Sequence, residues 1–174
     1  EARKLVKGRA AILSKIEKPA AVEAFDSILE VSDGIMVARG DLGVELPVEA
    51  VPPIQKRLVR ACRAKGKPVI VATQMMESMV NAPVPTRAEV SDVAQAIYEG
   101  ADAVMLSAES AAGMYPIEAV STMNNVAVEV EKDPTHRQIL ESARTPGKRG
   151  VSDAITVAAR EIAETTNVKA ICCF

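Results

Sequence analysis

Short apolar stretches alternate with longer amphipathic stretches over the first three quarters of the chain. We expect strands at 10–17, 34–41, 68–75 and 101–109. Each run is apolar almost throughout, which is typical of strands buried on both faces of a parallel sheet. Each run is followed by a helical pattern, so the alternation predicts an α/β fold of four consecutive βα units.

Helix start signals support this division. Thr86 and Glu89 have the spacing of a capping box. Proline is favoured in the first turn of a helix. The residues 42–53 after the second strand have the composition of a turn-rich connection. The expected helices begin at Pro19, near Pro53, at Thr86 and at Pro116.

The pattern changes after Lys132. Residues 133–150 are polar, with two prolines and two glycines, and this composition predicts a linker. A helical pattern from 151 and an apolar run from 168 predict the start of another α/β domain. We therefore expect a first domain at 1–132, a linker at 133–150 and the beginning of a C-terminal domain at 151–174.

Two architectures place helices against a parallel sheet: the open doubly wound sheet and the (β/α)₈ barrel. The sequence has no GxGxxG or GxxxxGK[ST] loop, which an open nucleotide-binding sheet often carries. Polar and charged residues follow the C-terminal ends of all four strands, where barrel enzymes place their chemistry. The pattern therefore favours part of a TIM (β/α)₈ barrel, of which four units would be half.

Composition narrows the range of functions. The 174 residues carry a net charge of −2, with no Trp, two Phe and two Tyr, which disfavours a nucleic-acid partner or an anionic membrane. No apolar run approaches the length that spans a bilayer. Three cysteines and a single histidine supply no zinc ligand set, and an odd cysteine count suits a reducing compartment. We expect a cytoplasmic protein.

Lys15 and Glu17 lie at the end of the first expected strand. Residues two apart in a strand point the same way, so both side chains should project to one side. A lysine there can hold negative charge on a phosphate or enolate, and a carboxylate can hold a hard cation. A structural ion pair would account for the same two residues.

Gly40 and Asp41 end the second expected strand. Glycine lets backbone N–H groups approach a ligand closely. Glu17 and Asp41 at neighbouring strand ends would form a magnesium site with positions open for substrate oxygens and water. Gly-Asp is also ordinary turn chemistry.

The third and fourth strands end in hydroxyl and carboxylate side chains. Thr73 could donate a hydrogen bond or relay a proton, and Ser107 and Glu109 alternate at the fourth strand end. Each signal is weak alone. Together they would converge on one face of one barrel.

In combination, several segments resemble the pyruvate kinase family, from Lys15 to about Val120. They are SKIE, SDGIMVARGDLGVELP, GKPVIVATQMMESM, PTRAEVSDVAQAIYEGADAVMLSAES and YPIEAV. The resemblance implies the second half of the catalytic barrel and transfer of a phosphoryl group from phosphoenolpyruvate to ADP, giving pyruvate and ATP. Where the family commonly has LSGET, this chain has Ala108 and Ser110.

The resemblance also implies roles for single residues. Lys15 would stabilise the transferring phosphoryl group and the enolate, and Thr73 would lie beside the substrate near the protonated carbon. Backbone amides around Ala38 and Gly40 would receive the substrate carboxylate, and Ser107 would belong to the proton path. Glu17 and Asp41 would ligate Mg²⁺ or Mn²⁺. The family also implies K⁺, whose ligands have no counterpart here, and a homotetramer.

The family's first four barrel strands, its lid domain and most nucleotide contacts are absent from these 174 residues. We expect the chain to be a fragment that begins and ends in mid-structure, and to have little or no kinase activity alone. Two alternatives stay open: another magnesium-dependent enolpyruvate or pyruvate barrel enzyme, such as a class II-type aldolase, and a non-catalytic half-barrel interaction module. Arg39 could face substrate or a subunit interface.

Overall fold

The computed structural model describes residues 1–142, 151–166, 168 and 170–172. The chain divides into two compact units, Glu1–Ala143 and Arg144–Phe174. Each unit is described by itself.

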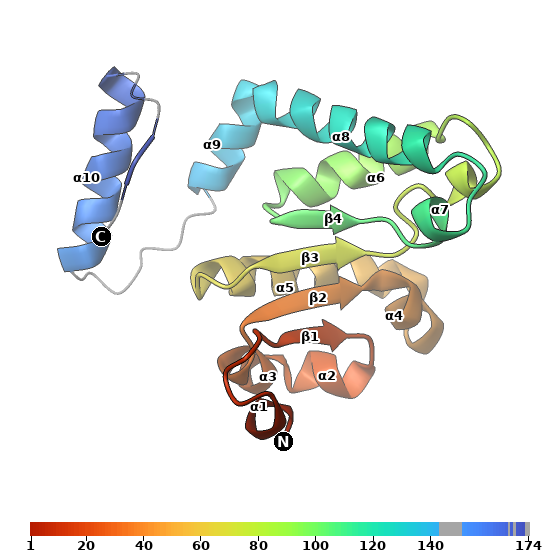
Figure 1. Ribbon diagram of the computed structural model, residues 1–174, viewed down its shortest axis with the longest axis horizontal. Coiled ribbons are helices and arrows are strands. Elements are labelled where there is room, and N and C mark those ends of the chain that lie inside the picture. The colour runs from red at the N-terminus through yellow and green to blue at the C-terminus, as the bar shows by residue number, and fades with distance from the viewer. Residues whose placement is uncertain (143–150, 167, 169, 173–174) are drawn as a thin grey trace. The chain divides into compact units, whose positions relative to one another are not determined.

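A four-stranded parallel sheet forms the centre of the first unit, with its strands side by side in chain order (Figure 1). The strands are β1 (Leu13–Ile16), β2 (Gly34–Ala38), β3 (Val69–Ala72) and β4 (Ala103–Met105). Leu13 pairs with Gly34, Ile35 with Val69, and Ile70 with Ala103. The predicted α/β fold with a parallel sheet is confirmed.

The strands are shorter than the sequence predicts, and two of them lead directly into short helices. Ala38 pairs with Ala72, but the next residue of the third segment, Thr73, has a φ of 72°, so the ladder cannot continue. The chain instead forms α4 (Arg39–Glu45) where a strand end and a turn were expected. Likewise α7 (Ala108–Ala111) occupies the expected end of the fourth strand. Both helices lie beyond the arrowheads of their strands (Figure 1).

The remaining helices of the first unit largely follow the predicted start signals. The expected first helix is divided at Ala24 into α2 and α3. The expected helix near Pro53 begins at Val51. The helices are α1 (Ala2–Val6), α2 (Pro19–Glu23), α3 (Phe25–Val31), α5 (Val51–Ala64), α6 (Arg87–Tyr98), α8 (Pro116–Lys132) and α9 (Pro134–Ser142). Two 3₁₀ turns are η1 (Val48–Ala50) and η2 (Glu77–Val80).

The capping box at the start of α6 is confirmed. Thr86 Oγ1 accepts a hydrogen bond from the Glu89 N–H at 3.2 Å, and Glu89 Oε2 accepts one from the Thr86 N–H at 2.7 Å. Glu89 also accepts hydrogen bonds from the backbone N–H and the hydroxyl of Ser78, at 2.7 and 2.6 Å. One carboxylate therefore joins the first turn of α6 to η2.

The core lies between the sheet and its helices. Consecutive residues of β2 and β3 are buried, as expected for strands covered on both faces. Helix α5 packs against both strands (Figure 1). After β3, three methionines are completely buried and pack in the core: Met75, Met76 and Met79.

The second unit contains α10 (Val151–Thr166), at the position predicted. The strand predicted from 168 lies partly outside the described residues, and its described residues, 168 and 170–172, are assigned to neither helix nor strand. Of the expected linker at 133–150, residues 134–142 form α9, and 143–150 lie outside the described residues. The domain limits stay a prediction.

Candidate functional site

Lys15 lies between two carboxylates at the carboxyl end of the sheet. Its Nζ is 2.5 Å from Glu17 Oε2 and 2.8 Å from Asp41 Oδ2. Parallel pairing of β1 with β2 brings the ends of both strands to the same edge, so Glu17 and the first turn of α4 reach one ammonium group. All three side chains are between about a third and a half exposed, so a ligand can reach them. The structure brings together the three charged residues singled out from the sequence.

The charges of this cluster support one another. Hydrogen bonds to Asp41 and then Glu17 raise the pKa of Lys15 to about 12. The hydrogen bond and the positive charge of Lys15 lower the pKa of Asp41 below its ordinary value. At neutral pH the ammonium and the Asp41 carboxylate are therefore both ionised.

Gly40 and Thr73 form a second contact at this edge. The Gly40 N–H donates a hydrogen bond to Thr73 Oγ1 at 2.6 Å, and the Thr73 hydroxyl donates one to the Ala72 carbonyl at 2.6 Å. A Cβ at residue 40 would lie 3.2 Å from Thr73 Oγ1, so the absence of a side chain permits this approach. The neighbouring Ala38 is completely buried. The Gly40 amide, expected from the resemblance to receive a substrate, is bonded to Thr73 here.

Arg39 holds the chain that follows β3. Its Nη2 donates to the carbonyls of Thr73 at 2.9 Å and Gln74 at 3.3 Å, while its Nη1 donates to Asp92 Oδ1 at 2.6 Å. The side chain is only 11% exposed. The sequence left open whether Arg39 faces substrate or a subunit interface. In the structure its guanidinium points into the first unit and binds other residues of the chain. Its contacts could not be predicted, because its partners lie 34, 35 and 53 residues further along the chain.

Ser107 belongs to a separate contact. Its N–H donates to Glu109 Oε2 at 2.7 Å, and Glu109 Oε1 accepts from the Met76 N–H at 3.1 Å. Glu109 is completely buried, so it anchors the segments after β3 and β4 to each other. In the described part of the chain, no hydrogen bond joins Ser107 to Lys15 or Thr73.

The donor set of the cluster suits a hard divalent cation. Within the described ranges no group of three or more His, Cys, Asp or Glu side chains could hold a metal by itself. Glu17 and Asp41, however, direct oxygens at one cationic group, so both could also reach a metal ion. Mg²⁺ commonly binds through one or two carboxylates and completes its shell with water and substrate phosphate oxygens. The two residues fit such a shared site.

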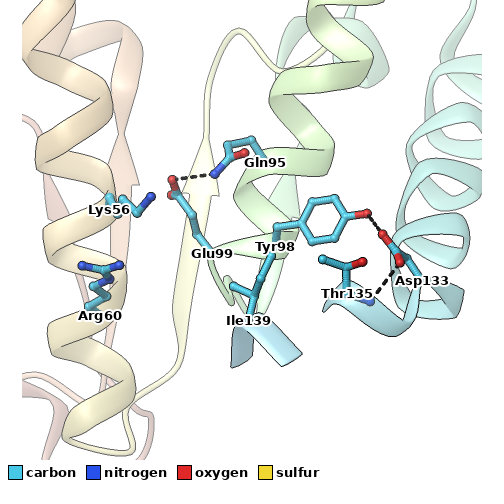
Figure 2. A pocket seen from close by; sticks show the side chains of 8 residues that line it. All are labelled: Lys56, Arg60, Gln95, Tyr98, Glu99, Asp133, Thr135 and Ile139. Carbon is cyan, nitrogen blue, oxygen red and sulfur yellow. Dashed lines mark hydrogen bonds between the residues drawn. The ribbon is translucent and has the colours of Figure 1, made fainter. Parts of the chain in front are cut away.

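A pocket of about 360 Å³ lies elsewhere in the first unit, between α5, α6 and α9 (Figure 2). Hydrogen bonds already join several of its polar groups: Gln95 to Glu99, and Tyr98 and the Thr135 N–H to Asp133. It contains none of the residues predicted for the site. Its lining residues are Lys56, Arg60, Gln95, Tyr98, Glu99, Asp133, Thr135 and Ile139.

Successive βα units with polar side chains at the carboxyl edge of a parallel sheet define the class of α/β proteins that bind ligands at that edge. Residues 2–120 match the family model described as "Pyruvate kinase, barrel domain". The chain belongs to the pyruvate kinase family. No helix in the described ranges has the length and apolar character needed to cross a membrane.

Curated relatives agree with this assignment. A pyruvate kinase of Methylorubrum extorquens is 58% identical over 98% of this chain, and one of Agrobacterium vitis is 55% identical over 94%. A third, from Bacillus licheniformis, is 53% identical over 92%. The matched regions cover 36%, 34% and 27% of those proteins, so the chain spans about a third of their length.

Proposed function

We propose that this chain is part of a longer enzyme that transfers a phosphoryl group from phosphoenolpyruvate to ADP, giving pyruvate and ATP. The observation that carries the proposal is the ammonium of Lys15 held between Glu17 and Asp41 at the carboxyl edge of the sheet. Phosphoryl transfer depends mainly on positioning and on neutralising charge, and this cluster offers fixed charges of both signs. Membership of the pyruvate kinase family supports the choice of substrates.

Each residue then has a part in the reaction. Lys15 neutralises charge on the transferring phosphoryl group and on the enolate that remains. Thr73 lies beside the enolate carbon that takes up a proton, and Ser107 belongs to the path of that proton. Amides around Ala38 and Gly40 bind the substrate carboxylate. For this the Gly40 N–H exchanges its bond to Thr73 Oγ1 for one to a substrate oxygen.

Glu17 and Asp41 would hold Mg²⁺ or Mn²⁺. When bound, such an ion supplies positive charge that offsets the negative charge of phosphate oxygens. The protein's own part is to keep Asp41 ionised and to direct both carboxylates at one point, which Lys15 does. The K⁺ that the family implies would take its ligands from outside these residues.

The surrounding architecture is proposed on the same grounds. The four βα units would form the second half of a (β/α)₈ barrel, and α10 would begin a C-terminal domain. The full-length protein would be a cytoplasmic homotetramer, as the family implies. The 174-residue chain alone would have little or no activity, because half a barrel lacks the strands that close it.

The test is phosphoenolpyruvate-dependent ATP formation by the full-length protein encoded by the gene that carries this sequence. Lys15→Met should lower kcat/KM about 10³-fold or more, because the charge that meets the phosphoryl group is lost. Lys18→Met is the matched control: Lys18 belongs to the same strand end but pairs with Glu45, and its loss should change kcat/KM less than about threefold. Wild-type protein that forms no ATP, or equal effects of both substitutions, would refute the proposal.

A further inference from the structure

The side chain of Arg39 contacts three consecutive residues of the segment that follows β3. Three groups of consecutive residues accept from its Nη2: the Thr73 carbonyl, the Gln74 carbonyl and Met75 Sδ, the last at 2.8 Å. Its Nη1 is held by Asp92 at 2.6 Å and is 3.5 Å from Gln55 Oε1. Its Nε finds no partner in the described part of the chain, so the two terminal nitrogens set the position of the side chain.

The segment that Arg39 holds is strained. Thr73 and Gln74 have φ values of 72° and 53°. A positive φ is uncommon for residues other than glycine and is an outlier for a β-branched residue. Such a backbone conformation is strained and persists only where the surroundings impose it. The guanidinium supplies that constraint, since it binds the carbonyls of both residues.

The same segment carries the hydroxyl of the site. Arg39 binds the carbonyl of Thr73, and the next residue, Gly40, binds its Oγ1 at 2.6 Å. The residue after that, Asp41, binds Lys15. Three consecutive residues at the start of α4 thus fix Thr73 relative to the charged cluster.

We propose that Arg39 is a positioning residue for the reaction: it holds the Thr73–Gln74 segment in its strained form and so keeps the Thr73 hydroxyl in register with Lys15. This inference rests on the proposed function. Arg39 acts through Thr73, because its terminal nitrogens are occupied by other residues of the chain and little of its side chain is exposed.

The experiment compares Arg39→Gln and Arg39→Lys in the full-length protein, with Arg57→Gln as the matched control. Arg57 also donates to a backbone carbonyl, that of Val22 at 3.1 Å, but away from this segment. Arg39→Gln should lower kcat about 10- to 100-fold and change KM for phosphoenolpyruvate less than about threefold, the loss typical of a small misplacement of a reacting group. The kcat of Arg39→Lys should lie between those of wild type and Arg39→Gln, because one ammonium group cannot replace the planar set of donors of a guanidinium. Arg57→Gln should keep the wild-type kcat.

Two further measurements separate positioning from a merely structural role. Arg39→Gln should slow exchange of pyruvate methyl protons with deuterated solvent as much as it lowers kcat. The double variant Arg39→Gln/Thr73→Ala should have the same kcat as Thr73→Ala alone, because both substitutions remove the contribution of the positioned Thr73 hydroxyl. If Arg39→Gln does not fold, Arg39→Lys and Asp92→Ala supply the same comparison, because Asp92→Ala removes the ion-pair partner of Nη1 and leaves the contacts of Nη2 in place.

The outcomes are distinct. Wild-type kcat in correctly folded Arg39→Gln protein, or losses that multiply in the double variant, would overturn the inference and leave the proposed function standing. Wild-type protein that forms no ATP from phosphoenolpyruvate would overturn the proposed function and this inference with it.

Discussion

At the scale of single residues, the contacts of Lys15 contribute more to the site than to stability. Its ion pairs with Glu17 and Asp41 are partly exposed, and such pairs add little to folding free energy. Their effect is on ionisation: the ammonium and the Asp41 carboxylate keep opposite charges side by side across the neutral range. A bound metal ion would therefore compete with the ammonium, and not with a proton, for the Asp41 carboxylate.

Substitution of Asp41 tests this competition. Asp41→Asn should weaken Mn²⁺ binding to the full-length protein at least about 10-fold. Substitution of a residue that only hydrogen-bonds to a metal ligand already lowers metal affinity by about that factor, and Asp41 is proposed to be a ligand itself. Electron paramagnetic resonance of free Mn²⁺ measures binding without reference to turnover. Asp26→Asn, which removes an exposed carboxylate of α3, is the control and should leave binding unchanged.

The depressed pKa of Asp41 also fixes the pH dependence of metal binding. Because this carboxyl releases its proton below its ordinary value, it is already ionised at pH 6 and gains no further charge by pH 8. The Mn²⁺ dissociation constant should therefore differ less than about threefold between these pH values. A 10-fold loss of affinity at pH 6 would contradict the proposed ligand.

The sequence indicated these charged residues, but not what holds them. Lys15, Glu17 and Asp41 could be predicted to converge because parallel strands end at one edge of a sheet. The inward contacts of Arg39 depend on backbone angles at Thr73 and on a carboxylate in α6, neither of which local patterns specify.

At the scale of elements, capping residues and first-turn prolines predicted where helices begin more accurately than glycine- and aspartate-rich composition predicted where turns lie. Thr86 and Pro116 mark the starts of α6 and α8, because caps and first-turn prolines act locally. The segment RGDLGVE instead forms α4, although Gly-Asp is good turn chemistry. Tertiary contacts of Arg39 and Gly40 outweigh that preference, and no local pattern reveals them.

The connection between η2 and α6 depends on one side chain. Glu89 accepts from backbone N–H groups and hydroxyls of both Ser78 and Thr86. Glu89→Ala should destabilise this region by about 2 kcal/mol, the combined scale of a lost cap and lost hydrogen bonds to a charged group. Hydrogen exchange should quicken at the amides of Ser78 and Thr86. Glu77→Ala, at an exposed carboxylate of η2, should leave these amides unchanged.

The effect of Glu89 should also depend on pH. Burial raises the pKa of Glu89, but the hydrogen bonds from Ser78 and Thr86 outweigh burial, and the net pKa lies below its ordinary value. Its stabilisation is therefore fully present above the unfolded value of about 4.3 and is lost as pH falls through the lower folded value. The difference in exchange between wild type and Glu89→Ala should be full at pH 6 and shrink below about pH 4.

At the scale of the whole molecule, apolar side chains lie exposed at both ends of the first unit. Near β1 they are Leu5, Leu13 and Val31, and at the start of α8 they are Met114, Ile117 and Val120. In the proposed closed barrel the missing half would cover both edges of the sheet. The chain by itself exposes them, and open edges of this kind promote association.

The isolated 174-residue chain should therefore elute from size exclusion as oligomers or aggregates and form no ATP from phosphoenolpyruvate. Co-expression with the preceding part of the Methylorubrum extorquens relative should bring it into a discrete soluble complex, because that part would supply the missing strands. A stable, active monomer of 18.4 kDa would contradict both the half-barrel and the expected inactivity.

The strand order has a consequence for how the protein is made. Each strand pairs with the next one along the chain, and each partner follows within about 35 residues. A ribosome that adds about 5–20 residues per second supplies the next strand within about 2 to 7 seconds. We therefore expect the strands to join the sheet in the order in which they are translated, because each new strand pairs with the one made just before it.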